Sequence, residues 1–344
     1  MHARRSMRPA CPVHAGQPAG ALALLSVVSC LLVTVAFGEQ RAWARAESRP
    51  TAAQRGSAAG LVQRKPRASG RLRWAPPRLV RPITIRLTSP TRELNLSAGR
   101  DYVIRMPRFP IRPGPSGGLW ISGGRNVVLV GGELDFGSVT DPDEKSGRVA
   151  AIFNNTGTVH IEGLYAHGAG IVEGIQNYSA NSIVQVENCR FEHLRGSEAG
   201  HHSDLFQFPV GRELRIDRFN GSSSYQGLFV TDMTGHVYME RTNIVGDPGA
   251  QYLFWQGDAS VPQTLKQFYV RPAPGRSLGA SVWPSIWDDD PSRRPLYRGG
   301  GSLGWRPSVG ITGVVHRGRP PGGDFVPRRR PNVAYVSPGY RTRG

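Results

Sequence analysis

The chain has 344 residues, enough for one large domain or two smaller ones with a sizeable core. It holds 43 Gly and 28 Pro but only 8% aromatic residues, which favours many short segments joined by turns over long helices. The net charge of +18 is carried by the chain ends: residues 1–80 sum to +11, residues 291–344 to +10, and the stretch between them to −3. This near-neutral middle argues against a domain that binds nucleic acid specifically.

The first 44 residues have the parts of an export signal. A start with three arginines precedes the uncharged apolar run 21–37, and residues 42–44 offer a small-x-small cleavage site. We predict a cleaved signal peptide and a secreted, extracellular or periplasmic protein. The alternative is an uncleaved N-terminal membrane anchor, because the apolar run approaches the length that spans a bilayer. After cleavage Cys189 is the only cysteine, so no internal disulfide is expected.

Residues 45–80 are rich in Arg, Ala, Pro, Gly and Ser and have no steady apolar period. This composition is typical of a disordered basic linker.

Residues 81–272 contain an internal repeat. Each copy consists of a short apolar strand, a polar turn, an alternating strand, a tight corner and a third short strand. Corresponding strands are 23 to 31 residues apart, and no helix-length amphipathic stretch lies between them. The six copies are the segments 118–137, 150–168, 173–196, 203–223, 225–246 and 251–272.

The second strand of each copy alternates apolar and polar residues, as in Leu214-Arg215-Ile216. Strand geometry points Val186 and Ile216 inward, and Gln185 and Arg215 outward. Three strands per turn with apolar residues inward close into a coil that stacks in parallel on its neighbours. We therefore predict an all-β, single-stranded, right-handed parallel β-helix over residues 81–272. A β-sandwich would also use short strands, but it does not predict the same strand-corner-strand spacing six times.

The repeat resembles the right-handed parallel β-helix of the pectin-lyase-like superfamily. The resemblance rests on phrases such as residues 126–135, NVVLVGGELD, and residues 159–164, VHIEGL. Members of this superfamily are often carbohydrate-active and bind acidic polysaccharide along the outer face of a sheet. The resemblance therefore implies an exported protein that acts on or binds polysaccharide, as a polysaccharide lyase or a glycoside hydrolase of acidic glycans if it is an enzyme.

A candidate catalytic site lies in the stretch GHHSDLFQFPVG, residues 200–211. Aligning residues 173–176 with residues 204–207 superposes two carboxylates, Glu173 and Asp204, in consecutive turns. Alternation from an inward Leu205 would place His202, Asp204 and Phe206 on the outer face.

Two chemistries fit such a pair. Repulsion between neighbouring carboxylates raises one pKa and provides an acid beside a base, as glycoside hydrolysis needs. Alternatively, Glu173 and Asp204 would share a Ca²⁺ ion that bridges the protein to an acidic sugar. His201 or His202 would then transfer a proton.

A purely structural interpretation of the same stretch stays open. Gln176 and Gln207 would point inward and stack as an amide ladder, and the histidines would cap the loop before the strand. His160, His193 and His236 occur one per repeat and are expected on the surface.

A glycan groove needs aromatic rings to stack on sugars and cations to meet carboxylates. Near Asp204, Phe206 and Tyr225 would supply the rings, and Arg195 and Arg212 the cations. The expected partner is polysaccharide rather than a specific nucleic acid, the expected state is a monomer, and a membrane would be a partner only if the N-terminal anchor is retained. The alternative function is a non-catalytic glycan-binding or structural protein.

Residues 273–344 are rich in Pro, Gly, Trp and Arg. Pro and Gly at this density argue against long strands, while the tryptophans exceed what a disordered tail usually contains. We expect an irregular segment that packs on the β-helix or caps its end.

Overall fold

The computed structural model describes residues 72–87, 93–113, 117–137, 146–256, 261–283, 290–328 and 331–339. The chain divides into two units, Met1–Val62 and Gln63–Gly344, and every described residue belongs to the second. The predicted signal peptide and most of the predicted linker lie outside the described residues, so both stay predictions. Residues 72–80, which the composition assigned to the linker, are described and contact the folded domain.

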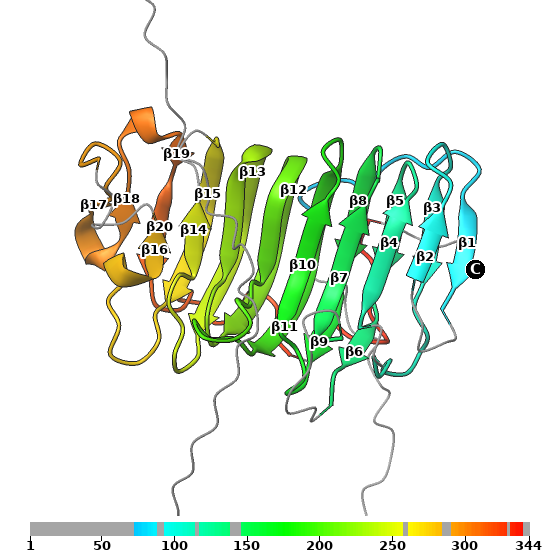
Figure 1. Ribbon diagram of the computed structural model, residues 1–344, viewed down its shortest axis with the longest axis horizontal. Helices are drawn as coiled ribbons and strands as arrows, with labels where there is room; N and C mark the ends of the chain where they lie inside the picture. Colours follow the sequence, from blue (N-terminus) through cyan, green and yellow to red (C-terminus); the bar gives the residue numbers. More distant parts are fainter. Residues whose placement is uncertain are drawn as a thin grey trace, which may run out of the picture. The chain divides into compact units, whose positions relative to one another are not determined.

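The described residues form a parallel β-solenoid of about seven turns over residues 93–283, which confirms the predicted all-β fold class. Strands of successive turns lie side by side from β1 at one end to β17 and β18 at the other (Figure 1). No α-helix occurs among the described residues, which contain three single-turn 3-10 helices: η2 (Gly279–Ser281), η3 (Gly299–Gly301) and η4 (Pro307–Val309).

Each turn contributes to three parallel sheets, named first, second and third in the order in which each turn passes through them from residue 93 onward. The first sheet contains β2 (Glu93–Leu96), β4 (Leu119–Gly123), β7 (Arg148–Phe153), β10 (Glu173–Tyr178), the starts of β12 (Phe206–Ser223) and β13 (Leu228–Gly246), β14 (Phe254–Gln256) and β16 (Val282–Trp283).

The second sheet contains β1 (Ile83–Arg86), β3 (Tyr102–Arg105), β5 (Val127–Val130), β8 (Thr158–Glu162), the start of β11 (Ile183–Leu194), the middle parts of β12 and β13, the start of β15 (Gln263–Arg271) and β19 (Ile311–Thr312). The third sheet contains β6 (Glu133–Asp135), β9 (Tyr165–His167), the ends of β11, β12, β13 and β15, and β20 (Val314–Arg317).

The core is a set of stacked apolar columns inside the three sheets. In the second sheet Ile161, Val186, Ile216 and Met239 pair in register across four turns, and all are buried. Each such side chain stabilises the fold by about 1.5–3 kcal/mol relative to leaving it exposed. The inward positions predicted for Val186 and Ile216 are confirmed.

One residue per turn makes the corner between the second and third sheets, and it has a positive φ. Gly163 (70°) and Asn188 (55°) tolerate this left-handed conformation well, whereas Arg218, Arg241 and Gln267 adopt it at a steric cost. The repeated single-residue corner explains the constant spacing from Ile161 to Leu164 that is visible in the sequence.

The C-terminal residues add to the solenoid and then run back along it. β17 (Leu296–Tyr297) and β20 flank β18 (Leu303–Gly304) in antiparallel pairing, and the buried ring of Trp305 packs on Phe254. Beyond β20, residues 319–328 contact the third sheet and residues 331–339 contact the corner beside the second sheet. The chain end therefore supplies side chains to the outer surface of the solenoid.

Candidate functional site

The register of the predicted carboxylate pair is confirmed. Ile175 pairs with Phe206 and Gln176 with Gln207, so Glu173 and Asp204 occupy equivalent places in consecutive turns. The backbone N–H of Asp204 donates a hydrogen bond to the Glu173 carboxylate at 3.4 Å. Gln176 also donates from its amide to Gln207, as an amide ladder requires.

The predicted faces of Asp204, Phe206 and Gln207 are wrong, whereas Leu205 is buried and His202 is exposed, as predicted. Phe206 is fully buried, with its ring packed edge-on against Phe219, and Gln207 lies half-buried on the outer side. β12 begins only at Phe206, so Asp204 and Leu205 precede the strand and do not follow its alternation. Phe206 and Gln207 point to opposite sides of the strand, so only one of them can enter the core. The phenyl ring of Phe206 is favoured there because burying the Gln207 amide without hydrogen-bond partners would cost free energy.

The predicted catalytic groups do not share an accessible surface. Glu173 and Asp204 are 2% and 1% exposed, while His202 is exposed and His201 half-buried. His202 lies against the ring of Tyr225 at 5.0 Å, and its Nε2 is 3.2 Å from the carbonyl oxygen of Glu198. Both carboxylates, predicted to face solvent, are therefore buried.

The predicted sugar-binding set is also split. Phe206 and Tyr225 are buried and offer no ring face to a sugar. Arg195 and Arg212 are exposed, and Arg195 donates to the carbonyl oxygen of Ala169 at 3.3 Å. The Ca²⁺ hypothesis rests on two carboxylates alone, because the described residues contain no group of three or more His, Cys, Asp or Glu arranged to hold a metal ion.

A row of stacked aromatic rings on the first sheet does not provide the glycan groove that was expected near Asp204. The rings of Trp120, Phe153 and Tyr178 stack at 5.2 Å from one to the next, and the guanidinium of Arg148 lies 5.7 Å over Trp120. Because their faces contact one another, these rings present mainly edges outward. Sugar rings stack on aromatic faces, so the row is best explained as packing.

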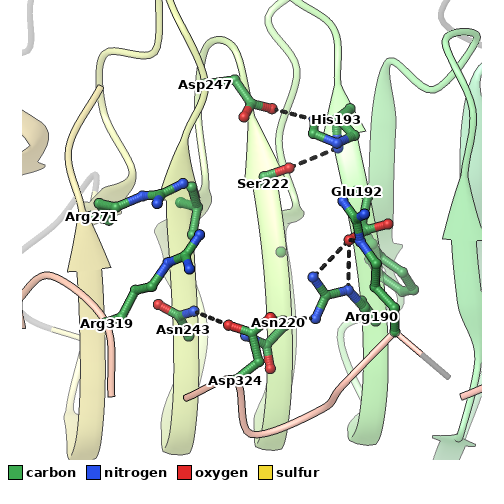
Figure 2. Close-up of a pocket in the computed structure, with 14 residues that line it drawn as sticks. Arg190, Glu192, His193, Asn220, Ser222, Asn243, Asp247, Arg271, Arg319 and Asp324 are labelled. Carbon is green, nitrogen blue, oxygen red and sulfur yellow. Dashed lines mark hydrogen bonds and ion pairs between the residues drawn. The ribbon is translucent and has the colours of Figure 1, made fainter. Parts of the chain in front are cut away.

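A pocket on the outer side of the third sheet has a different character (Figure 2). We call it the arginine pocket. It encloses about 90 Å³, and four consecutive turns and residues 319–328 build it. The polar residues that line it are Arg190, Glu192, His193, Asn220, Ser222, Asn243, Asp247, Arg271, Arg319, Asp324 and Arg328.

The floor of the arginine pocket is formed by side chains at paired positions of three successive strands in the third sheet. Arg190, Asn220 and Asn243 pair across β11, β12 and β13, so their side chains form one outward column. Asn220 and Asn243 are 3% and 1% exposed. The Oδ1 atom of Asn243 is buried and has no hydrogen-bond partner among the described residues. The floor therefore contains an acceptor that a donor from a ligand would satisfy.

His193 sits at the upper rim of the pocket because β11 is irregular there. The register between β11 and β12 shifts between Phe191 and Leu194, and His193 has a φ of 60°. Its Nδ1 lies 3.0 Å from the Asp247 carboxylate. A bulge of this kind re-aims a side chain, and bulges are common beside functional sites.

Residues 319–328 form the lower wall. Arg190 donates to the Asp324 carboxylate at 2.8 Å and to the carbonyl oxygen of Val326 at 2.7 Å. Arg328 and Arg190 both donate to Glu192 at 2.7 Å. Burial acts to raise the pKa of Glu192, but hydrogen bonds from Tyr165, Arg328 and Arg190 outweigh it and lower the pKa.

The flank opposite Arg190 is cationic and lacks counter-charges (Figure 2). Within the described part of the chain, no carboxylate lies at ion-pair distance from Arg271 or Arg319. Arg271 also lines an adjoining groove of about 490 Å³ with Arg276 and Arg317. The pocket and the groove therefore form one cationic track, which we call the arginine track.

The outer side of the second sheet carries the opposite charge. Glu162, Glu187, Asp217 and Glu240 pair in register across four turns, and the first three are fully buried. We call these four residues the acidic column. Burial raises the pKa of Glu187 to about 7 and also raises the pKa of Asp217.

Two segments from the ends of the described part of the chain, residues 72–74 and 331–339, cover the acidic column. The backbone N–H groups of Arg73 and Trp74 donate to Glu187, and the hydroxyl groups of Tyr335 and Ser337 donate to Glu162. His160, predicted on the surface, is instead buried beside this column. Its Nε2 lies 3.3 Å from a Glu162 carboxylate oxygen.

Sequence reasoning missed most of the arginine track. Arg190, Asn220 and Asn243 fall at equivalent places in the aligned repeats, so a column of polar residues there was a usable signal. Arg319 and Asp324 belong to an irregular segment without a period, and the sequence gives no sign that they meet the third sheet.

Comparison of the chain with protein-family models, with curated proteins and with solved structures found no match. Among the described residues, no helix has the length and apolar character needed to cross a membrane.

Proposed function

We propose that this chain is an exported β-solenoid that binds an acidic polysaccharide along the arginine track. The observation that carries the proposal is the position of Arg271, which lines both the pocket and the groove and has no carboxylate partner among the described residues. An unpaired guanidinium binds carboxylate or sulfate groups bidentately and gains most where it is partly shielded from water.

The continuity of the track favours a polymer over a small anion. Arg319, Arg271 and Arg317 lie on two adjoining depressions, so one chain with repeated negative charges would meet several of them. Each contact is modest by itself, and several contacts along one ligand add through effective concentration.

The walls favour a sugar over a nucleic acid. Asp247 and the partnerless Oδ1 of Asn243 accept hydrogen bonds, which sugar hydroxyls donate and phosphate oxygens do not. The resemblance of the repeat to the pectin-lyase-like superfamily supports the same class of ligand, and membership of that superfamily is part of this proposal.

Binding without catalysis is the form of the function that the geometry supports best, because Glu173 and Asp204 are buried. One observation favours catalysis as a second candidate. His193 is held by a bulge and pairs with Asp247 beside the arginines, an arrangement that suits an imidazole which transfers a proton. The activity would then be that of a polysaccharide lyase or a glycoside hydrolase.

The test is a binding panel with purified residues 45–344. The probes are polygalacturonate, alginate, a sulfated glycan, a neutral glucan and single-stranded DNA, at low and at physiological salt. We expect binding to one or more acidic glycans that weakens with salt, and little binding to the neutral glucan. Equal or tighter binding to DNA, or none to any acidic glycan, contradicts the proposal.

The same samples decide between binding and catalysis. New reducing ends without absorbance from unsaturated sugars would indicate a hydrolase, and reducing ends with that absorbance a lyase. We expect neither product.

A further inference from the structure

The lower wall of the arginine pocket has a feature that binding alone does not explain. Asp324 is a carboxylate that this chain places in its own anion site: one oxygen accepts from Arg190 at 2.8 Å and the other from Asn243 at 3.4 Å. A charged and an amide donor on the two oxygens is the arrangement that a ligand carboxylate would adopt there. The side chains of Arg190 and Asp324 are 11% and 30% exposed.

We propose that residues 319–328 act as a built-in competitor, with Asp324 occupying a carboxylate subsite that an acidic sugar takes when residues 324–328 move aside and Arg319 stays in place. This inference rests on the proposed function and concerns the regulation of the same site.

The segment is attached in a way that permits opening. It pairs with no described strand of the third sheet, and its backbone contacts side chains of that sheet: Val326 donates to Asn220 at 2.7 Å and accepts from Arg190. Its buried side chains are those of Pro320, at its start, and of Val326, which is 2% exposed. Few buried apolar contacts and the absence of strand pairing are features of segments that open locally while the rest of the fold stays closed.

A hinge precedes Asp324. Gly322 and Gly323 are exposed, Gly323 has a φ of 83°, and no atom lies near the place where a side chain on either would sit. Pro320, before them, is buried and fixes the start of the segment. The stretch beyond the glycines can therefore swing while residues up to 320 stay in place.

The chemistry explains why the segment stays closed without ligand. Opening would remove Asp324 and the Val326 carbonyl oxygen from Arg190, leaving this mostly buried guanidinium with Glu192 alone. Losing partners of a buried charged group is costly, so a replacement anion favours the open state. An acidic sugar supplies that anion, and a neutral sugar does not.

The test compares the wild type with Asp324→Asn and Val326→Ala, and uses Asp290→Asn as the control. Asp290 is an exposed aspartate outside the pocket. Asp324→Asn keeps the shape and removes the competing charge, and Val326→Ala loosens the anchor and keeps the charge. We expect each to raise the affinity for polygalacturonate at least threefold, and Asp290→Asn to change it by less than twofold.

A second readout does not depend on affinity. In the wild type, hydrogen exchange of the Val326 amide should become faster when polygalacturonate is added, because its acceptor on Asn220 is lost when the segment opens. If the wild type binds, and exchange at Val326 slows or stays constant while neither variant gains affinity, the competitor inference is wrong and the proposed function stands. If neither the wild type nor the variants bind any acidic glycan, both are wrong. Binding by the variants alone would be the strongest support for the inference.

Discussion

The outer sides of the second and third sheets both carry columns of polar residues that recur in each turn, but the two columns differ in charge and in what covers them. On the second sheet, Glu162, Glu187, Asp217 and Glu240 stack in register, and both chain ends cover them. On the third sheet, Arg190 begins a polar column beside Arg271 and Arg319, which have no carboxylate partners among the described residues.

The difference shows how a solenoid can separate structural charge from charge available to a ligand. Strands of one sheet are about 4.8 Å apart, so any charged position that recurs in the repeat becomes a column of like charges. In the acidic column Asp217 is matched by a bidentate contact from Arg241, and Glu240 by Arg73 and Lys266. In the arginine track, Arg271 and Arg319 have no such carboxylate partner among the described residues, and a ligand would provide one.

The largest effect is expected from a change that removes the support of both sheets. Ile216→Asp would bury a charge in the apolar column, at a cost of several kcal/mol, and should abolish folding. Arg215→Asp, one residue away on the outer side, should cost about 1 kcal/mol or less. Circular dichroism and limited proteolysis would check both. Equal behaviour of the two variants would contradict the assigned inward and outward positions.

The acidic column should make stability depend on pH. Burial raises the pKa of Glu187 from 4.5 to about 7, so the folded state disfavours the ionised form. The stability from this group is complete below pH 4.5 and falls as the pH rises toward and through 7. The loss is at most about 3 kcal/mol, since one pKa unit corresponds to about 1.4 kcal/mol.

Glu187→Gln isolates this contribution. It removes the charge and keeps one of the two oxygens that accept from the N–H groups of Arg73 and Trp74, so the lost hydrogen bond lowers stability equally at both pH values. The free energy of unfolding is measured with urea at pH 5 and at pH 8. It should fall less from pH 5 to pH 8 in the variant than in the wild type. The other acidic residues, including Asp217, are the same in both proteins and affect both alike. A wild type that gains stability relative to the variant on going to pH 8 would show that the carboxylate is stabilised by its surroundings.

A smaller effect is expected where the C-terminal end covers the acidic column. Gly163 has a φ of 70°, and a side chain on it would meet the ring of Tyr335. Gly163→Ala should cost about 1–2 kcal/mol from the left-handed backbone and also displace residues 331–339. Hydrogen exchange in this segment should become faster, with thermal unfolding as the stability measurement. An unchanged exchange rate would mean that the position of the Tyr335 ring does not require a glycine at residue 163.

The smallest effect is expected at the site that the sequence singled out. His202 is exposed and lines neither the pocket nor the groove, so His202→Ala should leave polysaccharide binding within twofold of the wild type. Isothermal titration with polygalacturonate measures this directly. Loss of binding would return attention to residues 200–211.

Particular residues show how far sequence reasoning reached. The positions of Val186 and Ile216 and the register of Glu173 with Asp204 followed from alternation and repeat alignment, because both are properties of the local chain. Alternation failed at Phe206 because the strand begins there and not at Leu205, and an error of one residue in the phase of the alternation reverses every face. His160 was misplaced because its cover comes from chain ends far away in the sequence.

The most direct test of the central claim is the affinity of one arginine variant for an acidic glycan. Arg271→Gln removes the cation shared by the pocket and the groove, and Arg212→Gln removes an exposed arginine outside both. With polygalacturonate at physiological salt, Arg271→Gln should lose about tenfold or more in affinity, since a hydrogen bond to a charged group contributes about 1.5–3 kcal/mol. Arg212→Gln should bind like the wild type. Equal losses in the two variants, or no loss in Arg271→Gln, would contradict a binding site on the third sheet.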